Sequence, residues 1–319
     1  MTIRSRIAGF GGYLPETVKS NDDMAKIVET SDEWIVERTG IRFRHFADEK
    51  TLTSDLAVHA AQKALAVAGM SGADIDVIVL GTVTPDRTFP ATAAYVQAAI
   101  GMTGGCAFDL SAACSGFLYS LKMADNMIRL GQAKNALVIG VETLSKITDF
   151  TDRNTCVLFG DGAGAAVLQA HEGEDGVIDT LIRSDGRHAP DLYATGGPSF
   201  NHEVGYITMN GREVFRHASV NMADASAEVL AKNGYTVDDV DWFVPHQANI
   251  RIMEAVAKRL GVPADKVLTT VDKHANTSAA SIPLALADGV ERGLLKKGQL
   301  IVSPAMGAGF TWGATLIRL

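Results

Sequence analysis

Cys114 has the surroundings of a nucleophilic thiol. It follows a short apolar segment that begins at Cys106, and an amphipathic helical pattern begins at about Ser115 and stops at Gly131. A thiol at a helix N-terminus faces unpaired backbone N–H groups and the positive end of the helix dipole, which lower the pKa of the thiol. Because a lone cysteine is more commonly a buried structural residue, Cys114 becomes a candidate nucleophile only in the company of other reactive groups.

Two further segments supply such groups. The apolar run 242–245 predicts a strand that delivers His246 at its C-terminal end, just before another helix. Asn276 lies among small residues and is also predicted to follow a strand and precede a helix. A Cys, a His and an Asn placed alike favour nucleophilic catalysis more than three unrelated structural roles.

The composition favours an enzyme of the cytoplasm. The chain has 319 residues, of which 47% are hydrophobic, enough for a large core. Its three cysteines, Cys106, Cys114 and Cys156, lack the spacing of a disulfide framework, which indicates a reducing compartment. Residues 1–6 show no signal-peptide core, and no apolar run approaches the ~20 residues of a membrane span. A net charge of −8 argues against a nucleic-acid partner.

Neither the glycine-rich segments nor the histidines indicate a cofactor or a metal. Gly9–Gly12 lacks the third glycine and the acidic residue of a dinucleotide fingerprint, and Gly160–Gly164 lacks the Lys-Ser/Thr of a P-loop. Tight turns and close packing of a sheet explain both segments better. The eight histidines are scattered without metal-binding spacing, so no metal is expected.

A helix–turn–strand pattern occurs twice in the chain, at a constant sequence offset. The first copy covers about residues 59–79 and the second about residues 225–244. Matching positions include Leu65 and Leu230, Asp76 and Asp241, and Val79 and Val244. The repeat predicts two related α/β halves, residues 1–172 and 173–319, each with a mixed sheet covered by helices. The nucleophile would come from the first half, and His246 and Asn276 from the second.

These segments resemble the β-ketoacyl-acyl carrier protein synthase III family, within the thiolase-like condensing enzymes. The run Ser31–Ile41, the segment Phe159–Ala165 and the segment Gly309–Gly313 match the same family, so the resemblance extends from about Ile7 to Leu319. It implies the thiolase fold, which is a pseudo-duplicated five-layer α/β/α/β/α arrangement with two mixed sheets.

The resemblance implies a homodimeric acyltransferase that starts fatty-acid synthesis. A short acyl group, such as the acetyl of acetyl-CoA, would pass to Cys114 and then to malonyl-acyl carrier protein, with release of CO₂ and CoA. A neutral His246 and the amide of Asn276 suit the enolate oxygen that decarboxylation creates. Backbone N–H groups of Cys114 and Ala308 would form the oxyanion hole. The CoA thioester is a substrate, and no cofactor is implied.

The resemblance also implies contacts to the rest of the acyl-CoA. The CoA contacts fall on Trp34, Arg38, Arg153, Gly211, Phe215, Ala248 and Asn249. An indole beside an arginine suits the stacking of adenine, and Arg153 suits a phosphate. Phe89 and Phe159 are assigned to the acyl pocket, Phe89 by reaching across the dimer.

An acidic carrier protein needs a local basic surface on an enzyme of net charge −8. Arg251, Lys258 and Arg259 are predicted to lie on one face of the helix that follows His246. Arg216, on a helix that begins near Asn210, would join them. An ordinary solvated helix face is the alternative interpretation of this pattern.

Three other functions remain open from the sequence. A relative on the same fold that starts a specialised polyketide or quinolone product would share Cys114, His246 and Asn276. A cysteine hydrolase of the papain type has the same Cys, His, Asn order, although the Cys-Gly-Ser-Cys-Trp context is missing here. The third is an inactive module that binds an acyl carrier. The length of the primer, and whether carrier protein or CoA holds the malonyl group, are open as well.

Overall fold

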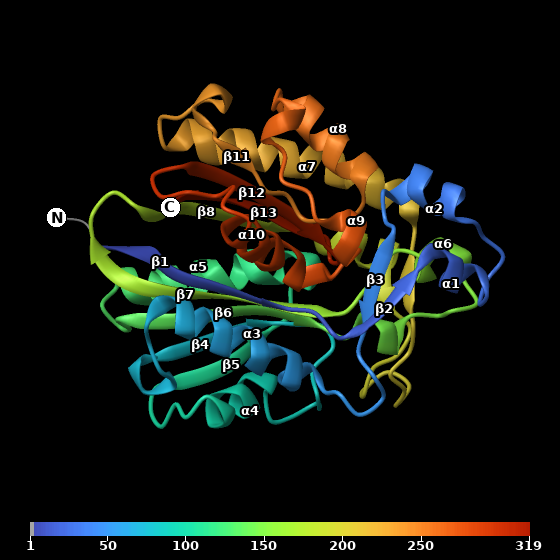
Figure 1. Cartoon of the computed structure of the whole chain (residues 1–319), viewed down its shortest axis with the longest axis horizontal. Helices are drawn as coiled ribbons and strands as arrows, with labels where there is room; N and C mark the ends of the chain where they lie inside the picture. The colour runs from blue at the N-terminus through green and yellow to red at the C-terminus, as the bar shows by residue number, and fades with distance from the viewer. Residues whose placement is uncertain (1–2) are drawn as a thin grey trace.

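Two β-sheets, each flanked by helices, form the protein (Figure 1). The computed structural model describes residues 3–319; residues 1–2, which begin the segment predicted to lack a signal peptide, lie outside the described part. The first sheet has the strand order β1-β7-β6-β4-β5, with β1 (Ile3–Tyr13), β4 (Val77–Gly81), β5 (Cys106–Leu110), β6 (Asn135–Glu142) and β7 (Gly162–Glu172). The second has the order β11-β12-β13-β8, with β8 (Gly176–Ser184), β11 (Trp242–Phe243), β12 (Leu300–Gly307) and β13 (Thr311–Arg318). Both sheets combine parallel and antiparallel pairs.

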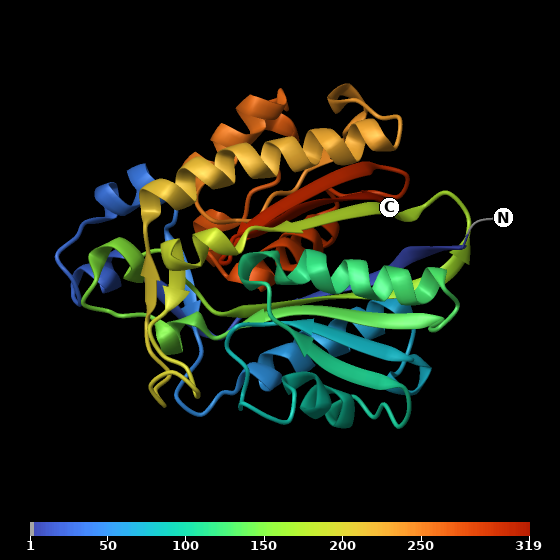
Figure 2. The same ribbon diagram turned by 180° about the vertical axis from the view of Figure 1, so that it is seen from behind.

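Helices complete the five layers. The helices are α1 (Asn21–Ala25), α2 (Asp32–Thr39), α3 (Thr53–Ala68), α4 (Thr92–Ala99), α5 (Gly116–Arg129), α6 (Arg153–Cys156), α7 (Gly211–Lys232), α8 (Ile250–Leu260), α9 (Val271–His274) and α10 (Ser281–Glu291). α3 and α4 cover the outer face of the first sheet, α7 and α8 lie over the second, and α5 and α10 lie between the sheets (Figures 1 and 2). This arrangement is the predicted thiolase-like fold. The chain is also duplicated as predicted, because β11 and β12 follow β4 and β6 at the offset of the sequence repeat.

The central layer joins the two sheets into one core. A single cluster of buried side chains contains Val79 of β4, Leu121 of α5, Leu286 of α10 and Ile301 of β12. α5 contacts strands of both sheets, whereas α10, which comes late in the sequence, packs on β1 and β7 of the first sheet. Because helices cover both faces, the five residues of β4 are all buried, which accounts for their continuous apolar sequence.

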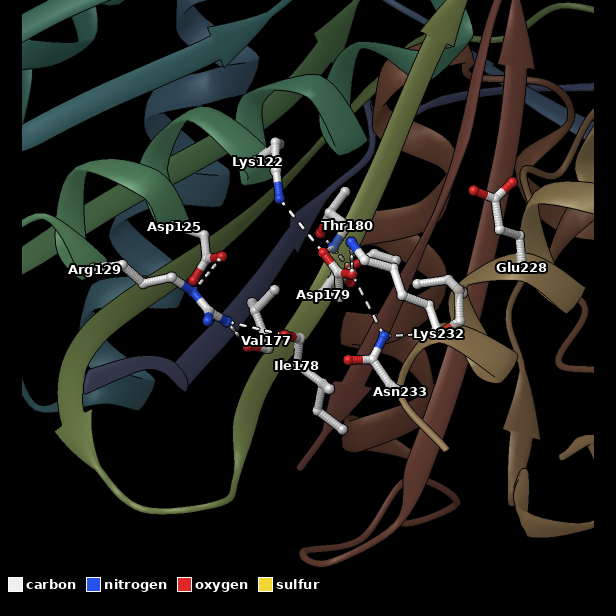
Figure 3. Close-up of polar contacts among 12 residues, drawn as sticks. Lys122, Asp125, Arg129, Val177, Ile178, Asp179, Thr180, Glu228, Lys232 and Asn233 are labelled. Carbon is white, nitrogen blue, oxygen red and sulfur yellow. Dashed lines mark hydrogen bonds and ion pairs between the residues drawn. The ribbon is translucent and has the colours of Figure 1, made fainter. Parts of the chain in front are cut away.

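A hydrogen-bonded cluster fastens the far end of α5 to the second sheet (Figure 3). The carboxylate of Asp125 is buried and accepts the Nε–H of Arg129 at 2.8 Å. Arg129 in turn donates to the carbonyl oxygens of Val177 and Ile178 at 2.6 and 3.0 Å. The register between β8 and β13 shifts at Ile178, so the guanidinium satisfies carbonyl groups beside a bulge.

A second carboxylate beside this cluster ties three elements together. Asp179 of β8 pairs with Lys122 of α5 at 3.5 Å and with Lys232 of α7 at 2.7 Å (Figure 3). These contacts set the axis of α5, and therefore the place of the turn that carries Cys114 at its other end.

Two small ribbons extend one side of the molecule, where the short helices α1, α2 and α6 also lie (Figures 1 and 2). The ribbons are β2 (Thr17–Ser20) with β3 (Phe43–Phe46), and β9 (Leu192–Ala194) with β10 (Ile207–Met209). Within residues 3–319, no helix is long and apolar enough to span a bilayer.

Candidate active site

A cavity of about 290 Å³ opens where the carboxyl ends of strands from both sheets meet. Cys114, His246 and Asn276, which lie far apart in the sequence, all line it. Most of the remaining wall is apolar, including Phe159 and Met306. The structure therefore brings together the three residues that the sequence singled out.

Cys114 lies in a strained turn between β5 and α5. The 3₁₀ turn Ala113–Ser115 precedes α5, and Ala113 adopts a left-handed φ of 47°. The turn is held from β13, because the hydroxyl of Thr311 donates to the carbonyl of Ala112 at 2.8 Å. Gly307 of β12 packs so closely that a Cβ there would lie 2.5 Å from the backbone N of Cys114. The position of the sulfur is thus fixed by the second sheet.

The predicted lowering of the Cys114 pKa is wrong. The thiol is partly accessible from the cavity, yet burial raises its pKa to about 12. A hydrogen bond with Ser278 opposes this rise, and the negative charge of Glu142 adds to it. The prediction considered only the helix that follows Cys114, whereas the dominant cause is the protein that surrounds the sulfur and displaces water. The resting thiol therefore holds its proton at neutral pH.

His246 is held as a neutral hydrogen-bond donor. Its backbone N–H donates to Pro304 at 2.8 Å, which extends β11 alongside β12 and buries the ring at 2% exposure. Burial lowers the pKa of the imidazole to about 3. The Nδ1 atom lies 2.7 Å from Ser281 Oγ, which accepts the N–H of Gln247 at 3.4 Å. In the tautomer with its proton on Nε2, the neutral ring accepts the hydroxyl of Ser281 at Nδ1 and presents Nε2–H as a donor.

Asn276 does not follow a strand, contrary to the prediction. The segment before it forms a single bridge, Phe243 with Val267, and then the short helix α9. Asn276 instead pairs with the loop after α6: its N–H donates to Leu158 O at 2.9 Å. Its side-chain Oδ1 accepts the N–H of Ser278 at 2.9 Å, which leaves the amide N–H groups as donors. Backbone pairing across the site thus replaces the missing strand in positioning this side chain.

The predicted backbone donors lie at the same cavity. Ala308 follows β12 and lines the cavity together with Cys114. The carbonyl of Ala308 accepts the hydroxyl of Thr311 at 3.1 Å, so one side chain ties together the two turns that would form the oxyanion hole. Ala308 is not among the non-glycine residues with positive φ in the described chain, so alanine fits this turn without strain.

The predicted CoA contacts fall into two groups. Gly211, Phe215, Ala248 and Asn249 line the cavity. Trp34, Arg38 and Arg153 form a separate cluster outside its lining. In that cluster the guanidinium carbons of Arg38 and Arg153 lie 4.5 and 4.8 Å from the centroid of the Trp34 ring.

The two residues predicted for the acyl pocket also differ. Phe159 lines the cavity and is 6% exposed. Phe89 lies outside the lining of this chain's cavity and is 81% exposed. Phe89 is therefore free to contact a second molecule.

Known proteins match the chain along its whole length. Residues 108–186 match the 3-oxoacyl-[acyl-carrier-protein (ACP)] synthase III family, and residues 230–319 match its C-terminal part. A β-ketoacyl-[acyl-carrier-protein] synthase III of Paramagnetospirillum magneticum is 56% identical over 324 residues, which cover 100% of both chains. The enzyme of the same name from Rhizorhabdus wittichii is 57% identical over 316 residues, 99% of each chain.

Two solved structures superpose closely on nearly the whole chain. The 3-oxoacyl-[acyl-carrier-protein] synthase III of Aquifex aeolicus VF5 superposes with a TM-score of 0.95 at 47% identity, covering 99% of this chain and 100% of that one. The priming β-ketosynthase of the R1128 polyketide pathway gives a TM-score of 0.94 at 34% identity, covering 99% and 96%. This chain belongs to the 3-oxoacyl-[acyl-carrier-protein] synthase III family. The family and its enzyme class, a condensing acyltransferase, are those predicted from the sequence.

Two of the four basic side chains predicted to receive the carrier protein already pair with acidic side chains. Arg251 and Lys258 are exposed on α8. Arg259, however, pairs with Asp224 of α7 at 3.1 Å, and Arg216 pairs with Glu213 at 2.6 Å. Asp224 comes from α7 and could not be found from the pattern of α8, whereas Glu213 lies three residues before Arg216 on the same helix.

Three side chains at the site escaped the sequence analysis. Ser278 and Ser281 lie in the segment of Asn276 and were treated only as small residues. Glu142 ends the buried strand β6 and is fully buried beside the turn of Cys114. An acidic residue that closes an apolar strand was the available signal, and its distance from Cys114 in sequence concealed the connection.

Proposed function

We propose that this chain joins a short acyl group from acyl-CoA to malonyl-acyl carrier protein, with loss of CO₂, and thereby starts fatty-acid synthesis. The observation that carries the proposal is the meeting of Cys114, a neutral His246 and the amide of Asn276 in one largely apolar cavity. Relatives at 56–57% identity bear the corresponding name.

The first half-reaction uses Cys114. The Cys114 thiol loses its proton as its sulfur attacks the thioester carbonyl of acyl-CoA, the C–S bond to CoA breaks, and the acyl group remains on Cys114 while CoA leaves as a protonated thiol. The oxygen becomes negative in the tetrahedral intermediate and accepts the backbone N–H groups of Cys114 and Ala308. Because the cavity wall is apolar, water is kept from the acyl-enzyme, which limits hydrolysis.

The second half-reaction uses His246 and Asn276. Loss of CO₂ from the malonyl thioester leaves an enolate, whose oxygen accepts Nε2–H of His246 and Nδ2–H of Asn276. The enolate carbon then attacks the acyl carbon on Cys114. The new C–C bond forms as the Cys114 sulfur leaves, and the product remains on the carrier.

The bound CoA would occupy both groups of predicted contact residues, with Gly211, Phe215, Ala248 and Asn249 along the pantetheine arm. Adenine would stack against Trp34, for which Arg153 must leave its place over the indole. The CoA thioester is a substrate here, and the proposed chemistry needs no cofactor or metal. Arg251 and Lys258, with Arg216 and Arg259, would receive the acidic carrier protein outside the cavity.

We propose a homodimer in the cytoplasm, with halves at residues 1–172 and 173–319. β5 is the outermost strand of the first sheet and its first residue, Cys106, is exposed. A second copy could continue the sheet at this edge. The exposed Phe89 would then reach the partner's acyl pocket.

Intact-protein mass spectrometry after exposure to a panel of acyl-CoAs tests the proposal. The expected result is addition of one short acyl group at Cys114, which malonyl-acyl carrier protein removes with release of CO₂. Failure of every acyl-CoA to modify Cys114 would contradict the proposal. Transfer only to a polyketide carrier would favour the second candidate function, which the likeness to the R1128 priming enzyme supports at a lower identity of 34%.

A further inference from the structure

Arg44 of β3 is a fully buried cation that, in the described part of the chain, bonds to backbone carbonyls rather than to a carboxylate. Its Nη2 donates to the carbonyl oxygen of Val157 at 3.1 Å, and its Nη1 donates to that of Lys19 at 3.4 Å. Burial lowers the pKa of the guanidinium to about 10, so it stays protonated at neutral pH. Burial without a counter-charge costs free energy, so a cation here points to a role for the two carbonyls that it joins.

The two carbonyls belong to different parts of the fold, and the rigid fork of a guanidinium can reach both. Lys19 lies directly across from Arg44 in the ribbon of β2 and β3, whereas Val157 follows α6. Gly160 packs against the arginine as well. A Cβ on Gly160 would lie 3.4 Å from the Cβ of Arg44 and 2.9 Å from the carbonyl oxygen of His274. The segment 157–160, the Val157 loop, is thus packed between the ribbon and α9.

The Val157 loop is the segment that pairs with Asn276 across the site. The N–H of Asn276 donates to the carbonyl of Leu158 at 2.9 Å, and its carbonyl accepts the N–H of Gly160 at 3.0 Å. Phe159, between them, forms a bridge with Asn276, and both Leu158 and Phe159 line the cavity. The position of Asn276 therefore depends on the position of this loop.

The backbone just before Asn276 is strained. Ala275 has a φ of 58° and a ψ of −163°, a conformation that alanine rarely adopts. A residue keeps such a conformation only where the surrounding structure holds it. The Val157 loop holds the residue that follows Ala275. On the other side α9 lies beside β3 (Figure 1), and the N–H of Arg42 donates to the carbonyl of Asp272 at 2.8 Å.

We propose that Arg44 is a positioning residue for Asn276. Its guanidinium holds the Val157 loop against β3, and the loop holds the backbone of Asn276 where its amide meets the enolate oxygen. Arg44 contacts no reacting atom, because it is fully buried outside the lining of the cavity. The inference rests on the proposed function and concerns its second half-reaction alone. The turn of Cys114 is held instead by β12 and β13.

Arg44→Met tests the proposal, because methionine fills much of the same space without donating a hydrogen bond. The variant should acylate Cys114 at an unchanged rate. Release of CO₂ from malonyl-acyl carrier protein should fall by about ten- to a hundredfold, because a small displacement of a donor is that costly. The loss should appear in kcat with little change in KM. Single-turnover acylation, read by mass spectrometry, and release of labelled CO₂ measure the two steps.

Two results of this experiment would overturn the proposal. Normal decarboxylation by Arg44→Met would show that Asn276 does not depend on the guanidinium, and an equal loss in both steps would show a general structural role. If Arg44→Met does not fold, Arg44→Lys keeps the charge and shortens the reach of the donors. It should show the same split between the two steps with a smaller loss, and a loss without that split would contradict the proposal.

A double variant shows whether Arg44 acts through Asn276. Arg44→Met should add little to the loss of decarboxylation that Asn276→Ala already causes, because the side chain to be positioned is gone. Multiplied losses would contradict the assignment. Arg42→Met is the matched control, because Arg42 is exposed and its bond to Asp272 is made by the backbone. It should leave both steps unchanged, and a loss of decarboxylation equal to that of Arg44→Met would assign the effect to charge alone and overturn the proposal.

Hydrogen–deuterium exchange tests the same contacts without a substrate. In Arg44→Met, peptides that contain Gly160 and Asn276 should exchange about tenfold faster or more, because the Val157 loop opens more often, while residues 114–118 keep their rate. Unchanged exchange at Asn276, or a uniform increase along the whole chain, would overturn the proposal. If the unmodified protein transfers no acyl group, the proposed function fails, and the exchange rates still decide whether Arg44 holds this loop.

Discussion

Two turns, residues 113–115 and 278–280, begin the two central helices with matching backbones. The first residue of each, Ala113 and Ser278, has a φ of 47°, and the two are separated by the offset of the sequence repeat. Each is a 3₁₀ turn, and α5 or α10 follows it directly. The strand ends that face them, Gly307 of β12 and Glu142 of β6, are related by the same offset.

The side chains at these equivalent places are different. Cys114 opens into the cavity, whereas its counterpart in the second turn, Ala279, is 1% exposed and does not line it. The first turn faces a glycine and the second faces a carboxylate. The duplicated backbone thus forms two similar turns. One carries the nucleophile Cys114, and the other carries Ser278 beside the buried carboxylate of Glu142.

The largest effect should come from moving the thiol between the turns. Cys114→Ala should lower acyl transfer by about 10⁴-fold or more, because no sulfur remains to form the thioester. Adding Ala279→Cys should not restore it, since that side chain is buried. Mass spectrometry with acyl-CoA measures both. Acylation of the double variant would show that the two turns are interchangeable.

Substitutions at His246 and Asn276, both in the second half, should impair one reaction step and spare the other. His246→Ala and Asn276→Ala should still acylate Cys114 but lower malonyl decarboxylation by about 10²–10³-fold, because each removes one donor from the enolate oxygen. Single-turnover acylation and release of labelled CO₂ measure the two steps. A block of acylation with normal decarboxylation in Asn276→Ala would reverse the assignment.

The smallest effect concerns the surface of the second half. Arg251→Glu should slow turnover with malonyl-acyl carrier protein by roughly three- to tenfold, more at low salt, because it weakens attraction to an acidic partner. Arg259→Glu should do less, since Asp224 already offsets Arg259. Lys134→Glu, an exposed change just before β6, is the charge-matched control. Equal salt dependence in all three would show that α8 presents only a solvated face.

The sequence predicted the site best where a reactive residue lies between an apolar strand pattern and a helical pattern. Cys114 and His246 each precede a helix and follow an apolar strand, so their segments could be predicted, and the constant offset between the two copies predicted the duplicated fold. Asn276 was misplaced because the strand expected before it is reduced to one bridge at Val267, and its position depends on pairing with a distant loop.

Electrostatics could not be predicted from local sequence. The pKa of Cys114 depends on burial and on Glu142, which reaches the site only after β6 and β4 have paired. The ion pair between Arg259 and Asp224 likewise depends on how α7 and α8 pack. Such contacts join residues whose separation in sequence carries no pattern.

The exchange of central helices has a consequence for how the protein unfolds. α5 follows a strand of the first sheet yet is fastened to β8 by Arg129, while α10 comes from the second half and packs on β1 and β7. Each half therefore lacks part of its cover when the other is missing. Although the sequence reads as two copies, the halves should melt in a single cooperative transition rather than as two autonomous folding units.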